Sequence, residues 1–241
     1  MKKFICLIAC LFAGSANAAI VGVFGNNGNT NITSFLNANG HSATNFGSSA
    51  PTSAQLNGYD AVIALRQDGN SDVKNFVLNG GLLITEWRAA EWALDTANLI
   101  NADGGNNVFF GTNTPITQTS LALSLGLGNG LSNPFADGGR TQFQWTLNNL
   151  GLGIDLLATR PGNIAAIIGG NVGTGYALIN SLDWGDSFPS GGSVSGTWLL
   201  NALNIDSFQG SGQVPEPATL VLLGLGLAGM SLSKKKTLAL P

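Results

Sequence analysis

Cysteine is almost absent from this sequence, because Cys6 and Cys10 are the only two and both lie within the first ten positions. Disulfides, thiolate metal sites and a cysteine nucleophile are therefore excluded from the rest of the chain. Histidine is equally scarce, so His41 is the one imidazole that could serve a serine nucleophile as its base. His41 falls between a predicted helix stop and a strand, where we expect a surface turn residue.

Charged side chains are also few. Between positions 19 and 213, five basic residues stand against twelve acidic ones, which gives a net charge of −7. This balance repels phosphate backbones and predicts that nucleic acid is not a partner. The carboxylates form no recognisable metal loop either: Asp68, Asn70 and Asp72 alternate as in a calcium loop, but Val73 stands where glycine is required. We expect neither a metal nor a cofactor.

Residues 1–18 have the three parts of a secretory signal peptide. Lys2 and Lys3 are followed by an apolar stretch at 4–13 and by small residues that end at Ala18. The apolar stretch is about ten residues long, too short for a helix to cross a membrane. We therefore predict a signal helix that is cleaved after Ala18, and a domain that begins at Ala19 and extends to residue 213.

The other end of the chain, 214–236, also has three parts. Pro215, Glu216 and Pro217 precede an apolar run at 218–233. Prolines on both sides of Glu216 keep the backbone extended, as a protease cleft requires. The apolar run predicts a transmembrane helix, and a basic cluster after it would stop transfer on the cytoplasmic side. The cluster consists of Lys234, Lys235 and Lys236.

This tail resembles the PEP-CTERM sorting signal of Gram-negative bacteria that produce extracellular polysaccharide. The resemblance implies export by the secretion machinery, a transient stay in the inner membrane, and processing by an exosortase-type membrane protease. The product would then reach the cell surface or the extracellular matrix of a biofilm. The alternative is an ordinary C-terminal anchor that is never cut, and the shortness of the apolar run argues against it.

Between the two ends, apolar runs without alternation predict strands that are buried on both faces, at 19–24, 61–65 and 82–85. Helical spacing of apolar residues occurs between them, at 31–39 and 71–79. Strand, helix and strand in this order imply parallel pairing with right-handed crossovers. We predict an α/β domain with a flavodoxin-like, mainly parallel sheet and helices on both faces.

The remaining segments are less regular. An edge strand is predicted at 42–46, and a hairpin is predicted from strands at 164–168 and 176–182. The segment 141–150 is ambiguous between helix and strand. Further helices are predicted at 88–100, 121–127 and 198–203.

The domain resembles the class I glutamine amidotransferase-like group, which includes trehalose-utilisation-type relatives, over about two thirds of its length. The residues that carry the resemblance are the strand and loop at 19–30, Asn39-Gly40-His41, 56–65, Gly80-Gly81-Leu82-Leu83-Ile84, 173–184 and 199–203. The family implies a cysteine just after the strand that ends at Thr85, and a histidine late in the chain. Glu86 and Trp87 occupy the first place, and no histidine follows His41. We therefore expect a domain without that chemistry, and lean against an enzyme.

Polar and aromatic residues follow the predicted strands at their carboxyl ends, where open α/β sheets bind ligands. Aromatic faces beside carboxylates and amides suit sugar rings. The alternative is that the tryptophans fill the core and that the charges are solvated. The candidate ligand rim consists of Asn26, Arg66, Asp68, Glu86, Trp87, Asp183 and Trp184.

Two functions remain open from the sequence. The first is a non-catalytic surface or matrix protein that interacts with carbohydrate in a polysaccharide layer. The second is a surface hydrolase acting on polysaccharide, with Glu86 and Asp183 as acid and base, which requires carboxyl groups roughly 5 to 9.5 Å apart.

The sorting tail leads to a first prediction. Replacing Glu216 by Ala should leave full-length protein in the membrane fraction, because the charged centre of the recognition element is lost, whereas the wild type should appear as a shorter surface form. Fractionation followed by intact-mass measurement checks this. Equal processing of the two chains would contradict the prediction.

Overall fold

The computed structural model describes residues 18–104, 107–110, 114–136, 142–145, 147, 149–162, 164–180, 194–205 and 208. The chain divides into two compact units, Met1–Gly210 and Ser211–Pro241. The expected signal peptide up to residue 17, and the whole second unit with the sorting tail, lie outside the described residues. Within the described part, no helix has the length and apolar character needed to cross a membrane.

A mixed sheet of eight strands forms the centre of the fold, in the order β2-β1-β3-β4-β10-β9-β8-β6. The first five are parallel to one another, and β9, β8 and β6 continue the sheet in antiparallel pairing. The strands are β1 (Ile20–Gly25), β2 (Ser42–Asn45), β3 (Ala61–Leu65), β4 (Leu82–Glu86), β6 (Thr117–Gln118), β8 (Asp155–Arg160), β9 (Ile164–Val172) and β10 (Gly175–Asn180). A separate antiparallel pair joins β5 (Asn107–Phe110) to β7 (Gln142–Trp145).

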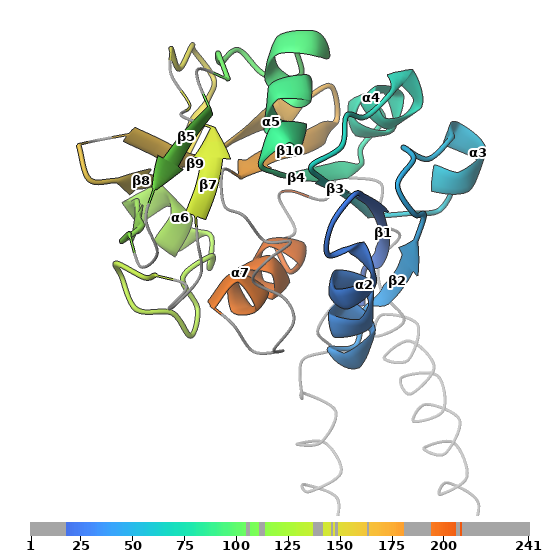
Figure 1. The fold of residues 1–241 in the computed structure, drawn as a ribbon, viewed down its shortest axis with the longest axis horizontal. Helices are drawn as coiled ribbons and strands as arrows, with labels where there is room; N and C mark the ends of the chain where they lie inside the picture. The colour runs from blue at the N-terminus through green and yellow to red at the C-terminus, as the bar shows by residue number, and fades with distance from the viewer. Residues whose placement is uncertain are drawn as a thin grey trace, which may run out of the picture. The chain divides into compact units, whose positions relative to one another are not determined.

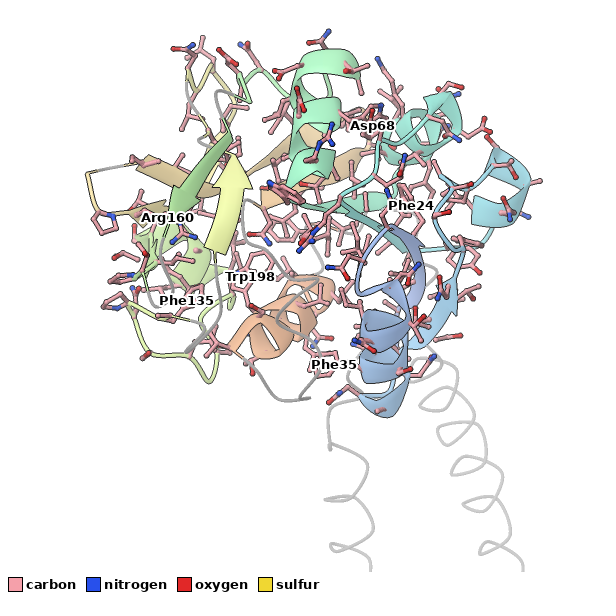
Figure 2. All side chains as sticks on the ribbon, viewed as in Figure 1. Phe24, Phe35, Asp68, Phe135, Arg160 and Trp198 are labelled. Carbon is pink, nitrogen blue, oxygen red and sulfur yellow. The ribbon has the colours of Figure 1, made fainter. Side chains whose placement is uncertain are left out.

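Helices cover both faces of this sheet, as Figure 1 shows. One core cluster joins the sheet to α2 (Asn29–Ala38), α6 (Ser120–Ser124) and α7 (Val194–Leu203). The other joins it to α3 (Ser53–Leu56), α4 (Ser71–Leu78), α5 (Arg88–Glu91) and the π-helical turn η2 (Trp92–Thr96). Trp198 belongs to the first cluster and Phe24 to the second, and Figure 2 shows them on opposite sides of the sheet. The predicted α/β class is confirmed.

Burial on both faces explains the absence of alternation in the central strands. In β1, Val21 and Val23 pack with the first cluster, and Phe24 packs with the second. All residues of β3 and β4 are buried. A strand with such surroundings has no solvent side, so apolar side chains are favoured at every position. The predicted adjacent, parallel arrangement of β1, β3 and β4 is confirmed.

The alternating polar residues around the start of α4 take part in helix capping. Asn70 is the N-cap of α4, and its Oδ1 accepts a hydrogen bond of 2.9 Å from the backbone N–H of Val73. Asp72 lies in the first turn, and its Oδ1 accepts a hydrogen bond from the Ser53 hydroxyl at 2.8 Å. An oxygen acceptor at the N-cap and an acidic residue in the first turn both stabilise a helix start.

The structure differs from the expected helix at 88–100. Regular helix ends at Glu91, and the π-helical turn η2 ends at Thr96. The backbone N–H of Ala97 bonds to the carbonyl of Trp92, and Asn98 then takes a left-handed conformation with φ 47°. Such a residue stops a helix. The ambiguous segment at 141–150 contributes the strand β7, and the predicted hairpin is formed by β9 and β10.

His41 is not the surface turn residue that we expected from the sequence. Its side chain is only 9% exposed, because the start of the first strand lies against it. The Nδ1 atom of His41 accepts a hydrogen bond of 3.2 Å from the backbone N–H of Ala19. Burial lowers the pKa of this imidazole, so the neutral form is favoured.

A pair of leucines tests how much burial contributes to stability. Leu83 in β4 is fully buried, whereas Leu78 at the end of α4 is 38% exposed. Leu83→Ala should lower the free energy of unfolding by about 2–5 kcal/mol, because it removes packed methyl groups and leaves a cavity. Leu78→Ala should cost below about 1 kcal/mol. Urea unfolding measures both, and similar losses would contradict the buried position of β4.

Candidate functional site

The carboxyl ends of the parallel strands meet along one edge of the sheet. In the register of β1 with β3, Gly25 pairs with Leu65, and in the register of β3 with β4, Leu65 pairs with Glu86. The residues that follow these three positions therefore leave the sheet at the same edge. This edge is where open parallel sheets place their ligand sites.

Gly25 makes the close approach of the first two strands possible. Its φ is 138°, and a Cβ atom at this position would overlap the carbonyl oxygen of Leu65. The next residue, Asn26, donates its backbone N–H to that carbonyl at 3.1 Å. The side-chain amide of Asn26 donates to Oε1 of Gln67 at 2.6 Å. A residue with a side chain at position 25 would push this part of the edge apart.

A carboxylate and a guanidinium meet at the middle of the edge. Nε of Arg66 lies 3.4 Å from Oε1 of Glu86, and the side chain of Glu86 is fully buried while that of Arg66 is 17% exposed. The backbone N–H of Arg66 also donates to the carbonyl of Glu86, at 3.4 Å. A buried carboxylate requires such a partner, since the loss of its hydration is otherwise uncompensated.

Trp87, directly after β4, has an unusual backbone. Its φ is 46° and its ψ is −118°, and it leads straight into α5. A bulky residue in this region is strained by about 1–3 kcal/mol. Strained strand-to-helix turns of this kind expose the nucleophile in α/β hydrolases. This chain therefore has a strained turn at the end of β4, and the turn carries an indole.

Arg66 connects the carboxylate to this indole. The guanidinium carbon of Arg66 lies 4.8 Å from the centroid of the Trp87 ring, within the range of a cation–π contact. Arg66 has a positive φ of 53°, so both residues that follow the central strands depart from ordinary backbone geometry. The three side chains of Arg66, Glu86 and Trp87 form one contact group, which we call the edge triad.

Sequence reasoning missed Asn180. This residue ends β10 and is fully buried, and its backbone N–H donates to the hydroxyl of Thr85 at 3.3 Å. Leu178 of β10 pairs with Ile84 of the parallel strand β4. Asn180 and Glu86 each lie two residues further along their strands, so they are opposite each other. The only available signal was a single amide in an otherwise apolar run, and the predicted strand continued past it.

The remaining candidate rim residues are not brought into the edge triad. Asp68 is exposed in the segment between β3 and α4, and Figure 2 labels it in the upper half of the view. Asp183 and Trp184 lie outside the described residues. Among the residues whose placement is described, no group of three His, Cys, Asp or Glu side chains could hold a metal ion.

The sheet order and the helices on both faces define an α/β domain with a mixed, mainly parallel central sheet. Solved structures share this fold. A cytoplasmic protein of Salmonella typhimurium LT2 matches with a TM-score of 0.60 and 12% identity, over 79% of this chain and 99% of that chain. A protein described as ThuA-like from Bacteroides uniformis also has a TM-score of 0.60 and 12% identity, over 80% of this chain and 93% of that one.

The same fold also occurs as part of a larger enzyme. A β-galactosidase from Bacillus circulans sp. alkalophilus matches with a TM-score of 0.53 and 11% identity, over 83% of this chain but only 32% of that chain. No curated protein matches the chain. At these identities the similarity establishes the fold alone.

The C-terminal tail shows how the chain is sorted. Residues 213–236 match the PEP-CTERM protein-sorting motif, as the resemblance of the tail indicated. The chain is thus an exosortase-sorted, exported protein that is routed through the membrane to the cell surface. Its central domain has the fold of the cytoplasmic Salmonella protein and of the ThuA-like protein.

The edge triad predicts a characteristic pattern of stability. Arg66→Ala should lower the free energy of unfolding by about 3 kcal/mol, because the buried carboxylate of Glu86 loses its guanidinium. The double variant Arg66→Ala/Glu86→Gln should recover at least about 1 kcal/mol, because it also removes the charge. Arg88→Ala is the matched control, since Arg88 is exposed, and it should change stability by less than about 0.5 kcal/mol. Urea unfolding of the four chains checks this. Equal losses in the single and double variants would contradict the pairing.

Proposed function

We propose that this protein is a non-catalytic component of the extracellular polysaccharide layer, and that its domain binds carbohydrate at the sheet edge formed by the edge triad and Asn26. The exosortase processes the chain, and the released domain then acts at the cell surface. The observation that carries the proposal is Trp87, a partly exposed indole at the carboxyl end of β4 that is held against the guanidinium of Arg66.

The chemistry of the edge supports a sugar ligand. The C–H face of a sugar ring stacks on an aromatic ring, and its hydroxyls require planar polar partners. Trp87 supplies the ring, and the amides of Asn26 and Gln67, hydrogen-bonded to each other at 2.6 Å, lie at the end of the neighbouring strands. Arg66 lies against the indole and limits its rotation. A ligand then loses less free energy in ordering the side chain.

Backbone strain supports a function at this edge. Positive φ values at Arg66 and Trp87 cost free energy and are retained where the surrounding structure requires them. Two such residues follow adjacent strands and touch each other. Solvated loop ends have no need of this geometry, so a binding role accounts for it better.

The hydrolase alternative, with Glu86 and Asp183 as acid and base, has less support. A general acid must reach the glycosidic oxygen, but the Glu86 side chain is fully buried and is paired with Arg66. Asp183 lies outside the described residues.

Binding of the purified exopolysaccharide of the producing strain tests the proposal. Trp87→Ala should weaken binding about tenfold, the factor that corresponds to the loss of a stacking contact of about 1.4 kcal/mol. Affinity gel electrophoresis of the exported protein measures this. Tyr59→Ala is the matched control, because Tyr59 is a partly exposed aromatic residue at the opposite end of the strands, before β3. Unchanged binding by Trp87→Ala, or an equal loss in both variants, would overturn the carbohydrate proposal and leave the export of the protein unaffected.

A further inference from the structure

The predicted signal cleavage site coincides with the first buried residue of the domain. Ala18 is exposed, whereas Ala19 is 1% exposed. The carbonyl of Ala19 accepts a hydrogen bond of 2.9 Å from the backbone N–H of Ser42, which begins the pairing of β1 with β2. A cut between Ala18 and Ala19 therefore places a new α-amino group at the entrance of the sheet.

The atom that becomes this amino group already has a partner. The backbone nitrogen of Ala19 donates to Nδ1 of His41 at 3.2 Å. The backbone of His41 is itself fixed, because its N–H donates to the carbonyl of Leu36 at 3.1 Å at the end of α2. Nδ1 accepts a hydrogen bond only in the neutral imidazole, and burial lowers the pKa of His41, which favours that form.

We propose that His41 is the receptor for the mature N-terminus, and that it binds the α-amino group created at Ala19 by signal cleavage and so closes the first strand of the sheet. The amino group replaces the peptide N–H as donor at the same position. His41 thus has a role in maturation, at the edge opposite to the one proposed for carbohydrate.

The charges around this position favour a bound amino group. The surrounding elements β1, β2, β3 and α2 contain no Asp, Glu, Lys or Arg. The carboxylate of Asp60 lies beside the next residue, because its Oδ2 accepts a hydrogen bond of 2.7 Å from the backbone N–H of Ile20. A negative charge one residue away stabilises an ammonium group.

The hydrogen bonds of Ala19 and Ile20 also indicate whether signal cleavage occurs before or after β1 joins the sheet. A protease binds its substrate as an extended segment on both sides of the cut, but Ala19 and Ile20 are already held in the sheet by His41, Ser42 and Asp60. Cleavage therefore precedes closure of β1, while the chain emerges unfolded. Closure then removes the new amino group from solvent.

Amine labelling of the exported, mature protein tests this proposal. The domain has two amines, the α-amino group of Ala19 and Lys74, whose Nζ donates to the carbonyl of Ala97 at 2.7 Å. A short pulse of an acetylating reagent at about pH 7.5 labels α-amino groups in preference to lysines in an unfolded chain. In the native wild type, labelling at Ala19 should be at least about tenfold slower than in guanidinium, because the amine is buried and bonded. Peptide mass spectrometry measures each site separately.

Two substitutions give the proposal its control. His41→Ala removes the acceptor and should speed native labelling at Ala19 about fivefold, whereas His41→Gln retains an acceptor oxygen and should stay protected. Labelling at Lys74 reports whether each variant is folded, and if His41→Ala does not fold, the wild type and His41→Gln decide. A mature chain that does not begin at Ala19, a native wild type labelled as fast as the denatured chain, or equal rates in folded His41→Ala and wild type would overturn the proposal.

Discussion

The parallel register of β1, β3 and β4 is the constraint on which the rest of the domain depends. Because Gly25, Leu65 and Glu86 are paired across the three strands, each strand ends at the same line and its chain must leave the sheet there. Every residue before that line is buried between two helical layers and is apolar, with few exceptions. Polar side chains are therefore found at the strand ends, where the backbone no longer takes part in the hydrogen bonds between strands.

Much of this arrangement could be predicted from the sequence, for a physical reason. Runs such as Ala61–Leu65 lack alternation because both of their faces are buried, and that pattern is visible without coordinates. The helix at 88–100 was predicted wrongly beyond its first turns, because the π-helical turn and the left-handed Asn98 depend on local backbone bonds that hydrophobic spacing does not encode. His41 was misjudged because the residue that buries it, Ala19, lies 22 positions away.

The candidate site was predictable in position but not in geometry. Arg66, Glu86 and Trp87 were selected because they follow strands, and the register brings them together. Neither the strained backbone of Trp87 nor the burial of Glu86 leaves a signal in residue type, since tryptophan does not favour positive φ and glutamate does not favour burial. Asn180 was missed because the surrounding apolar run predicts a strand that continues past it, so the amide is not recognised as the end of the strand.

The turn after β4 places a side chain at the edge of the sheet through a strained backbone. A strained strand-to-helix turn lifts one side chain above the sheet, and this effect does not depend on whether that side chain is a nucleophile. With tryptophan there, the strain orients an indole that cannot attack a carbonyl but can stack. Beside this turn, the carboxylate of Glu86 is buried and is held in an ion pair with Arg66. The strained turn costs free energy, but it produces a rigid surface. A rigid surface loses less conformational entropy when a ligand binds, in the same way that a rigid active site favours catalysis.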